Sequence, residues 1–306
     1  MSLMEKTGTI WLDGEFVDWQ DAKVHCLTHT LHYGYGVFEG VRAYQTPKGT
    51  SIFRLDAHTK RLFNSAKILK IKMTYSEDEL NEVQREVLRR NQLAAAYLRP
   101  MVFLGAEYLG LQTGNLSTHT MIAAWEWGAY LGEENLKKGI RIHTSSFTRS
   151  HVNSIMCRAK ANGNYMNSIL ALKEAQANGY DEALLLDSQG FIAEGSGENI
   201  FIIKNGKIYT PNLTSALEGI TRDTIMILAA ELGMPVVEKS ITRDELYIAD
   251  EAFFTGTAAE VTPIREVDNI SIGQGKPGPI TMQLQQLYLS HVAGKVETHQ
   301  EWHSVI

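Results

Sequence analysis

The sequence predicts a two-domain protein of mixed α and β structure. The chain has 306 residues, enough for two domains or for one large one. Strand-like and helix-like hydrophobic patterns occur in both halves. An irregular stretch at 127–132, followed by the charged run 133–138, interrupts these patterns. We therefore expect an N-terminal α/β domain over 4–127, a linker over 128–138 and a C-terminal domain over 139–306.

The N-terminal half begins with a predicted hairpin. Its strands, Ile10–Leu12 and Glu15–Val17, flank Asp13-Gly14, a strong two-residue turn signal. Asp56 is expected to cap a helix over Ala57–Leu69. The other elements expected in this half are a helix that opens at a Ser76–Glu79 capping box and strands over Tyr97–Leu104 and Thr120–Trp125.

The C-terminal half combines strands, hairpins and helices. A strand over Ile140–His143 opens it. A helix from about Asn164 to Asn178 is expected to stop at Gly179, since glycine favours helix C-termini. The two hairpins expected in this half pair Ala183–Leu186 with Phe191–Ala193, and Phe201–Ile203 with Lys207–Tyr209 around Asn205-Gly206.

The composition excludes several classes of protein. Lys and Arg total 29 against 35 Asp and Glu, a formal net charge of −6, which argues against binding to nucleic acid. No apolar run reaches the length of a membrane span, so we expect no membrane insertion. The two cysteines, Cys26 and Cys157, cannot make a disulfide framework, and they fit a reducing, cytoplasmic setting.

Lys160 and Glu194 are the first candidates for chemistry. A lysine whose pKa is lowered by its surroundings can form an imine, and Lys160 stands among small and polar neighbours. A lone lysine is more often a surface charge, so the assignment depends on the residues that accompany it. Glu194 ends a predicted apolar strand, where it could face a cofactor or could be a strand-end charge in water.

Two glycine–threonine loops predict phosphate binding. Gly219-Ile220-Thr221 directly precedes a strongly helical stretch, Asp223–Ala230, and the N–H groups at a helix N-terminus bind anions. Gly256-Thr257-Ala258 follows the predicted strand Ala252–Phe254 and offers further amides, and Arg61 could add positive charge. Each loop alone is a weak signal. An amine, a carboxylate and two such loops are together the parts needed to hold pyridoxal 5'-phosphate (PLP).

A metal site is the competing interpretation. His25, His29 and His32 follow the spacing i, i+4, i+7, which could place three imidazoles on one helix face. No glutamate stands near them in a metalloprotease arrangement, and the helical pattern around them is poor. We therefore expect no metal site. Gly195-Ser196-Gly197 also lacks the spacing of a nucleophilic serine elbow.

Seven motifs together resemble the class IV, fold-type-IV PLP enzymes, and among them the branched-chain amino acid aminotransferases. The resemblance runs from about Ile10 to Ile272. The motifs are His32-Tyr33-Gly34 with Val37-Phe38-Glu39-Gly40-Val41-Arg42, Tyr97-Leu98-Arg99-Pro100, Trp127-Gly128-Ala129-Tyr130-Leu131-Gly132, Lys160 with Gly163-Asn164-Tyr165, Glu194-Gly195-Ser196-Gly197-Glu198-Asn199, Leu217-Glu218-Gly219-Ile220-Thr221-Arg222, and Gly256-Thr257-Ala258-Ala259-Glu260.

The resemblance implies a fold and a set of cofactor contacts. A small α/β domain and a larger pseudo-barrel domain would hold PLP between them. Lys160 would be the Schiff-base lysine and then the proton shuttle, and Glu194 would pair with the pyridine nitrogen. Tyr165 would hydrogen-bond the phenolic oxygen of the cofactor. The residues implied at the phosphate are Arg61, Gly219, Ile220, Thr221 and Thr257.

The resemblance also implies substrate contacts and an oligomer. Tyr97 and the amides of Thr257 and Ala258 would hold the α-carboxylate. The residues implied to line the apolar side-chain pocket are Phe38, Leu109, Leu111, Trp127 and Tyr165. Those implied at the second carboxylate of glutamate are Arg99, Tyr33 and Tyr130. Tyr33 and the Leu111 region would come from a neighbouring subunit, so the resemblance implies a homodimer at least, and a homohexamer built from dimers.

The expected reaction is amino transfer between a branched-chain L-amino acid (leucine, isoleucine or valine) and 2-oxoglutarate, giving the branched-chain 2-oxo acid and L-glutamate. Two rivals stay open. One is another class IV chemistry, either a D-amino acid aminotransferase or an aminodeoxychorismate lyase, which would share Lys160 and Glu194. The other is a scaffold that holds PLP without catalysis. The stretch Phe38–Arg42 and the aromatic linker favour the branched-chain enzyme.

Overall fold

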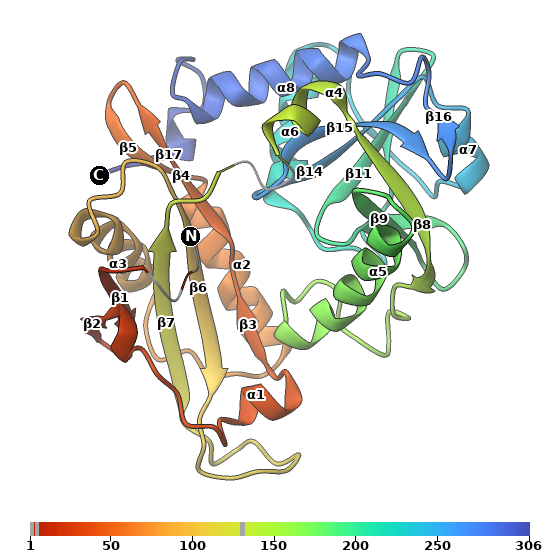
Figure 1. Cartoon of the computed structure of the whole chain (residues 1–306). Coiled ribbons are helices and arrows are strands. Elements are labelled where there is room, and N and C mark those ends of the chain that lie inside the picture. The colour runs from red at the N-terminus through yellow and green to blue at the C-terminus, as the bar shows by residue number, and fades with distance from the viewer. Residues whose placement is uncertain (1–2, 4–5, 129–131) are drawn as a thin grey trace. The chain divides into compact units, whose positions relative to one another are not determined.

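Hydrophobic side chains collect into separate cores in two units of the chain. The computed structural model describes residues 3, 6–128 and 132–306 (Figure 1). Unit 1 contains residues 1–127, 159–163 and 292–306, and unit 2 contains residues 128–158 and 164–291. The segments 159–163 and 292–306, which we expected in the C-terminal domain, thus group with unit 1 by their contacts.

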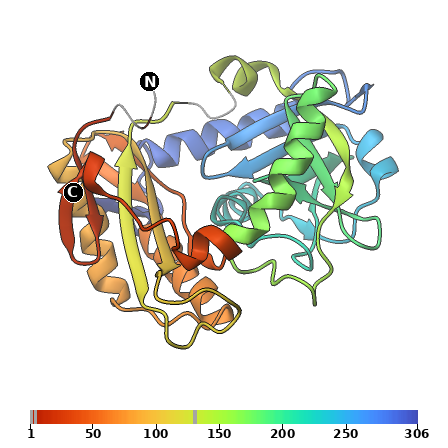
Figure 2. The same cartoon turned by 60° about the horizontal axis from the view of Figure 1, so that its bottom comes forward.

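Unit 1 is built on an antiparallel sheet. Its strand order is β17 (His303–Val305), β5 (Gly49–Phe53), β4 (Val41–Thr46), β6 (Ala96–Leu104), β7 (Thr118–Trp125), β1 (Thr9–Leu12) and β2 (Glu15–Asp18), with β3 (Gly36–Phe38) paired to β6. The helices of this unit are α1 (His29–Tyr33), α2 (Leu55–Ile68) and α3 (Glu77–Arg90), with 3-10 turns at Trp19–Asp21 and Gln300–Trp302, and a further 3-10 turn at Asn162–Asn164 ends in unit 2. The two longer helices lie beside the sheet in both views (Figures 1 and 2). They bury Leu62 and Leu80 in one core with Ile122 of the sheet.

Two local predictions in unit 1 are confirmed. Leu12 pairs with Glu15 across the first hairpin, and both turn residues, Asp13 (φ 50°) and Gly14 (φ 101°), adopt the positive φ that such turns require. The capping box is also present. Ser76 N donates to Glu79 Oε2 at 2.7 Å, and Glu79 N donates to Ser76 Oγ at 3.2 Å.

The predicted cap of α2 is wrong. The helix begins at Leu55, and Arg54, with φ 55°, is the residue that precedes it. Asp56 lies in the first turn, where its Oδ1 accepts a hydrogen bond from Asn81 Nδ2 of α3 at 2.8 Å. A long-range partner therefore takes the carboxylate that the local pattern assigned to the helix end.

Unit 2 contains a mixed sheet. Its strand order is β10 (Ile192–Gly195), β9 (Glu182–Leu186), β8 (Ile140–Thr148), β15 (Glu260–Val267), β14 (Glu251–Gly256), β11 (Asn199–Lys204), β12 (Lys207–Thr210) and β13 (Val237–Glu238), with β16 (Ile270–Ser271) paired to β15. β8 runs parallel to both β9 and β15, and the other pairs except β12–β13 are antiparallel. The helices are α4 (Glu133–Lys138), α5 (Tyr165–Ala177), α6 (Ile220–Glu231), α7 (Arg243–Tyr247) and α8 (Pro279–Val292).

The predictions for unit 2 hold in their main features. The helix expected after Asn164 runs to Ala177, and Gly179 follows it with φ 79°. Both expected hairpins are present, and the second turns at Asn205 and Gly206. The mixed α and β fold class is thus confirmed. Within the described ranges, we find no helix that combines the length and the apolar character needed to cross a membrane.

Candidate active site

The backbone of Lys160 is fixed inside unit 1 by two elements. Its N–H donates to Ser65 Oγ of α2 at 3.0 Å, and its carbonyl accepts from Phe38 N of β3 at 3.0 Å. The Ser65 hydroxyl in turn donates to the carbonyl of Arg61, one turn earlier in α2, at 2.8 Å. One helix therefore sets the positions of both Lys160 and Arg61.

Two glycines allow the segment around Lys160 to lie close to α1. Gly34 ends α1 with φ 65°, and its carbonyl accepts from Gly163 N at 3.0 Å. A Cβ on Gly34 would lie 2.9 Å from Gly163 Cα, closer than real contacts allow. The glycines of these two motifs are therefore required by a close backbone approach as well as by a positive φ.

Cations lie against the aromatic ring of Phe38. The Nζ of Lys160 lies 5.1 Å from the ring centroid, and the Cζ of Arg99 lies 4.6 Å from it. Arg99 also lies 5.5 Å from the ring centre of Tyr97, and its Nη2 donates to the Tyr97 hydroxyl at 3.5 Å. The Nε of Arg99 is buried without a hydrogen-bond partner, and no carboxylate of the described chain pairs with this residue. Arg99 can therefore accept an anionic ligand group beside an apolar surface.

Tyr97 is held edge-on between aromatic neighbours and a glycine. Its ring meets that of Trp127 at 4.5 Å with an interplanar angle of 89°. A Cβ on Gly40 would lie 1.8 Å from the Tyr97 hydroxyl oxygen, so only glycine leaves room for it. Trp127 itself is 36% exposed. Gly40 of the Phe38–Arg42 motif therefore leaves the space that Tyr97, a predicted substrate residue on β6, occupies.

Arg61 forms a bidentate ion pair with Glu39. Its Nε donates to Glu39 Oε1 at 2.7 Å and its Nη2 donates to Oε2 at 2.9 Å. His58 Nδ1 also donates to Oε2, at 2.8 Å. Glu39 is fully buried. Burial alone would raise the pKa of Glu39, but the charge of Arg61 and the hydrogen bond from His58 outweigh it and hold the pKa below the ordinary value.

In unit 2, Glu194 is a buried carboxylate with an arginine partner. It lies on β10 and is 8% exposed, so it is not a strand-end charge in water. Arg149 Nε lies 2.9 Å from Glu194 Oε1, and Leu217 N donates to Oε2 at 3.1 Å. The other nitrogens of Arg149 donate to Asn167 Oδ1, Ser168 Oγ and the carbonyls of Gly195 and Ser196. These bonds fix the guanidinium and thereby the carboxylate beside it.

Two further carboxyls lie buried near this pair. Glu182 is 0% and Glu198 4% exposed. Burial, together with the charge of Glu182, raises the pKa of Glu198 well above its usual range. Burial also raises the pKa of Glu182. Arg149 therefore acts on three buried carboxyls, Glu182, Glu194 and Glu198, and Glu198 holds its proton at a pH where an exposed glutamate is ionised.

Both predicted phosphate loops have the expected local structure. Gly219 precedes α6, so the N–H groups of Ile220 and Thr221 have no acceptor within the helix. A Cβ on Gly219 would lie 2.0 Å from Asn199 Oδ1, so a larger residue does not fit. Thr257 and Ala258 lie half-buried in the turn between β14 and β15. These amides and threonine hydroxyls suit a phosphate dianion.

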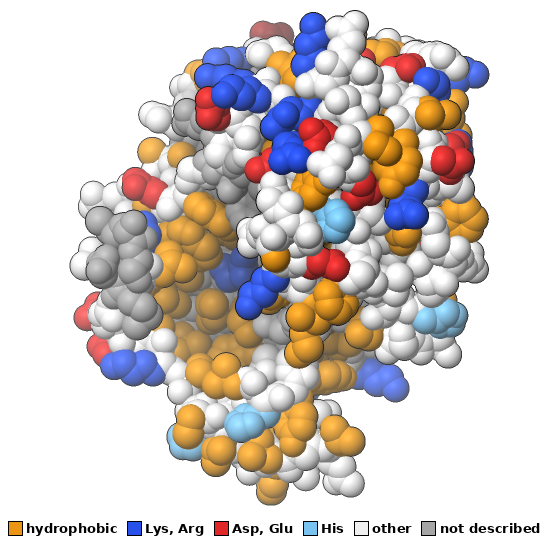
Figure 3. Space-filling view, turned by 45° about the vertical axis from the view of Figure 1, so that its right-hand side comes forward, with side chains coloured by type: hydrophobic (Ala, Val, Ile, Leu, Met, Phe, Trp, Pro, Cys, Tyr) orange, Lys and Arg blue, Asp and Glu red, His pale blue; other side chains and the backbone are white. Residues whose placement is uncertain are grey.

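The remaining predicted residues are less enclosed. Tyr165 is the first residue of α5 and is half-buried. Tyr33, Leu109 and Leu111 are 46%, 49% and 91% exposed. Figure 3 shows hydrophobic and histidine side chains gathered at this α1 end of unit 1. Tyr130 lies outside the described residues, and no predicted role is tested for it.

The three histidines of the competing metal interpretation have separate partners. His29 Nε2 bonds to the Gly110 carbonyl at 2.8 Å, and His32 Nε2 to the Cys26 carbonyl at 3.0 Å. His25 Nδ1 accepts from a backbone N–H at 3.1 Å. Across the ranges that the structure describes, no three His, Cys, Asp or Glu side chains gather as metal ligands do.

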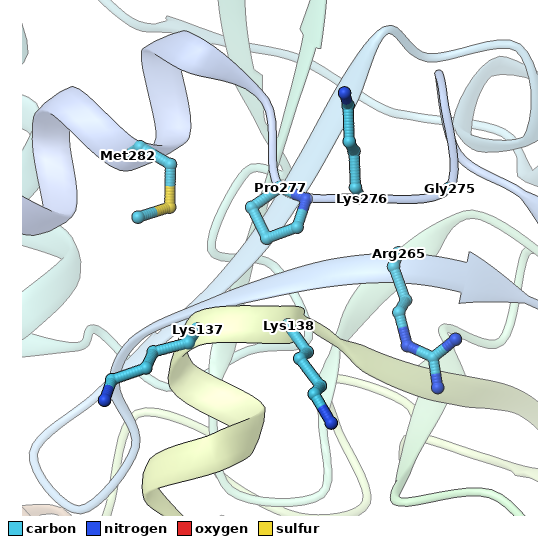
Figure 4. A pocket seen from close by; sticks show the side chains of 7 residues that line it. All are labelled: Lys137, Lys138, Arg265, Gly275, Lys276, Pro277 and Met282. Carbon is cyan, nitrogen blue, oxygen red and sulfur yellow. The ribbon is translucent and has the colours of Figure 1, made fainter.

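Unit 2 also contains a basic pocket of about 590 Å³, and none of the predicted site residues is among those that line it. It is lined by Lys137, Lys138, Arg265, Gly275, Lys276, Pro277 and Met282 (Figure 4). Lys138 pairs with Glu134 at 2.5 Å, and the ammonium groups of Lys137 and Lys276 point in different directions. This pocket contributes none of the groups that the predicted chemistry requires.

The residues present fit PLP chemically. Unit 1 supplies an amine, the Nζ of Lys160, near the ring of Phe38 and a guanidinium, that of Arg61, fixed by Glu39. Unit 2 supplies a buried carboxylate and two sets of backbone amides. Sequence reasoning missed Arg149 and the role of Glu39, since neither has a local pattern. The only signals in the sequence were that Arg149 directly follows the end of β8 and that Glu39 lies inside the Phe38–Arg42 motif.

Comparison with known proteins identifies the family. The family model described as "Amino-transferase class IV" matches residues 36–267. A branched-chain-amino-acid aminotransferase of Pseudomonas aeruginosa is 62% identical over 306 residues and covers 100% of both chains. The T.th. branched-chain amino acid aminotransferase with pyridoxamine 5'-phosphate is similar in structure, with a TM-score of 0.95 and 48% identity over 98% of this chain and 99% of that one. The same T.th. protein complexed with N-(5'-phosphopyridoxyl)-L-glutamate gives a TM-score of 0.93 and 46% identity over the same shares. These matches confirm the resemblance and the fold-type-IV fold class.

Proposed function

The chain belongs to the class IV aminotransferase family, and we propose that it transfers the amino group of branched-chain L-amino acids to 2-oxoglutarate, giving branched-chain 2-oxo acids and L-glutamate. It is a PLP-dependent enzyme, a transaminase. The observation that carries the substrate assignment is Arg99, a cation without a carboxylate partner among the described residues, which lies on the ring of Phe38. A site of this kind accepts an apolar side chain and a carboxylate in turn.

The chain's own groups divide the chemistry between them. When bound, PLP supplies an electron sink for the carbanion formed at the substrate α-carbon. We propose that the Nζ of Lys160 holds the cofactor covalently and then moves the α-proton, and that Glu194 keeps the ring nitrogen protonated. Arg149 supports this role because it keeps a positive charge 2.9 Å from Glu194. Tyr165 is proposed to donate to the phenolic oxygen.

The phosphate and the substrate have their own proposed contacts. Arg61, Gly219, Ile220, Thr221 and Thr257 bind the phosphate in this proposal, and the first N–H groups of α6 support it. Tyr97 and the amides of Thr257 and Ala258 hold the α-carboxylate. Phe38 and Trp127 form the apolar wall, with Tyr33, Leu109, Leu111 and Tyr130 as the further substrate contacts carried over from the family motifs.

A substrate panel tests the proposal against the rival class IV chemistries. Purified holoenzyme would be assayed with L-leucine, D-alanine and aminodeoxychorismate. We expect turnover with L-leucine and 2-oxoglutarate and little or none with the other two. Preferential turnover of D-alanine, or release of product from aminodeoxychorismate, would replace the assignment. A protein that binds PLP but makes no product in a single turnover with L-valine would be a scaffold instead.

We further propose that the enzyme is a homodimer at least, assembled into a homohexamer, and that it works in the cytoplasm. Six large hydrophobic side chains exposed at the α1 end of unit 1 support the dimer: Leu27, Leu31, Tyr33, Tyr108, Leu109 and Leu111. An exposed apolar patch of this kind marks an interface in soluble proteins. Leu111→Asp should shift the protein to monomers in sedimentation velocity, whereas Ile270→Asp, at an exposed position of unit 2, should not. An unchanged oligomer would remove this patch from the interface.

A further inference from the structure

Glu39, His58 and Arg61 form a polar network in the interior of unit 1. Glu39 has 0% relative exposure, the side chain of His58 is 3% exposed and that of Arg61 is 12% exposed. Both carboxylate oxygens are used: Oε1 accepts from Arg61, and Oε2 accepts from Arg61, from His58 and, at 3.3 Å, from the backbone N–H of Gly40. A carboxylate only accepts hydrogen bonds, so the Nδ1 of His58 carries the proton that it donates.

The network fixes the plane of the guanidinium. Two parallel bonds along the Nε–Nη2 edge of Arg61 leave the side chain no freedom to rotate about its end, unlike a single contact. The backbone of Glu39 is itself held in place, because its N–H donates to the Pro100 carbonyl at 2.8 Å. A guanidinium carries five N–H donors, and Glu39 accepts from two of the nitrogens that bear them.

Stability alone does not explain the network. Burying an ion pair costs desolvation energy that often exceeds the attraction gained, and apolar residues of similar volume serve a core equally well. Burial lowers the pKa of His58 and outweighs the hydrogen bond and the charge of Glu39, which act in the opposite direction; the charges of Arg61 and Lys160 add to the lowering. Burial thus favours the neutral form of His58, in which Nδ1–H still donates to Glu39.

We propose that Glu39 and His58 are positioning residues that hold the Arg61 guanidinium in the orientation in which it binds the phosphate of the cofactor. This rests on the phosphate role proposed above for Arg61. In this arrangement Glu39 contributes no contact to the ligand. It converts a flexible side chain into a fixed donor, and His58 fixes the carboxylate that does so.

The consequence is specific to the phosphate. Removing Glu39 or His58 should weaken the binding of PLP and leave the binding of pyridoxal, which lacks the phosphate, unchanged. A general disturbance of unit 1 would weaken both ligands. The ratio of the two affinities therefore separates positioning of Arg61 from structural damage.

The test is a titration of the cofactor-free enzyme with PLP and, separately, with pyridoxal, followed by absorbance. The variants are Glu39→Gln, His58→Leu, Arg61→Gln and the double variant Glu39→Gln/Arg61→Gln. We expect Glu39→Gln to weaken PLP by about ten- to a hundredfold with pyridoxal unchanged, the loss of one charge-assisted contact. The double variant should lose no more than Arg61→Gln, because both changes remove the same contact.

Two controls keep the outcomes distinct. Glu86→Gln breaks a 2.8 Å pair with Arg90 on the exposed side of α3 and should change neither affinity. Circular dichroism of each cofactor-free variant reports folding, and His58→Leu, which keeps the Glu39–Arg61 pair, serves if Glu39→Gln does not fold. His58→Asn keeps a donor and should restore most of the PLP affinity.

The possible failures point to different parts of the argument. If Arg61→Gln leaves the ratio of PLP to pyridoxal affinity unchanged, the proposed phosphate role of Arg61 is wrong. If Arg61→Gln changes the ratio but Glu39→Gln and His58→Leu leave it unchanged, or tighten PLP, the positioning role is overturned. Equal weakening of both ligands by Glu39→Gln would make the network a purely structural one.

Discussion

Arg99→Leu should separate the two half-reactions of the proposed cycle. Leucine offers an α-carboxylate and an apolar side chain, and Arg99 is not proposed to contact either of these groups directly. Glutamate offers a second carboxylate. In the structure, the buried Nε of Arg99 has no partner and no described carboxylate pairs with the residue, so that second carboxylate would find its cation here.

The size of the effect follows from the contacts of Arg99. A charge-assisted hydrogen bond contributes roughly 1.5–3 kcal/mol, or about ten- to a hundredfold in kcat/KM, and this loss falls on glutamate alone. The contacts with the rings of Phe38 and Tyr97 are worth about 0.5–1 kcal/mol each. Their loss is shared by both substrates. Together these two contacts are worth about 1–2 kcal/mol, so the difference between the substrates should be comparable to or larger than the loss that they have in common.

The assay follows the absorbance of the bound cofactor in single turnovers with L-leucine and with L-glutamate. Arg90→Leu removes a comparable contact, a guanidinium 3.9 Å from the ring centre of Phe16, and should affect neither half-reaction. Arg99→Lys keeps the charge and loses the planar fork, so it should lie between wild type and Arg99→Leu. Equal losses for leucine and glutamate in Arg99→Leu would mean that Arg99 shapes the site as a whole, and the dual-substrate assignment would fail.

Three further predictions concern the titratable groups of the site. Lys160→Ala should abolish turnover and leave the circular dichroism spectrum unchanged, because the backbone bonds of residue 160 to Ser65 and Phe38 do not need its side chain; turnover near the wild-type rate would remove Lys160 from the mechanism. Glu194→Gln should retain PLP but slow proton abstraction severely in stopped-flow single turnovers with L-leucine, because a neutral amide does not hold the ring nitrogen protonated; a wild-type rate would argue against this role. Glu198→Gln should alter the pH dependence of stability. The pKa of Glu198 is raised above its ordinary 4.5, so above pH 4.5 the native chain holds a proton that the unfolded chain has lost, and stability falls as the pH rises through the folded-state pKa. The glutamine variant should show a shallower fall in thermal unfolding measurements above pH 4.5, and an unaltered pH profile would mean that Glu198 is ionised in the native chain.

Local chemistry explains what could be predicted of the fold. The turn at Asp13-Gly14 and the capping box at Ser76 depend on residues at most three apart, and both are present. The cap assigned to Asp56 failed because Asn81, from a different helix, takes its carboxylate. Contact between residues far apart in the chain leaves no pattern in a single sequence.

The same limit applies to the site. Lys160 and Glu194 could be singled out from their neighbours, but Arg149 lies 45 positions before Glu194 and only the pairing of β8 with β9 and of β9 with β10 brings their regions together. Glu39 was visible within a motif, yet nothing local indicated that it would be fully buried and bound to Arg61. The sequence thus predicted the groups proposed to meet the ligand and missed those that hold them.

The two buried ion pairs have opposite polarity, and this agrees with the charges of the proposed ligand. In unit 1 a buried carboxylate, Glu39, fixes a cation, Arg61. In unit 2 a buried cation, Arg149, fixes a carboxylate, Glu194. The phosphate of PLP is an anion and its protonated ring nitrogen a cation, so each needs a fixed partner of the other sign. An isolated buried carboxylate would take up a proton, because burial raises its pKa, whereas a guanidinium keeps its charge. Arg149 therefore favours the ionised form of Glu194, and Glu39 fixes the orientation of Arg61, which stays charged without it.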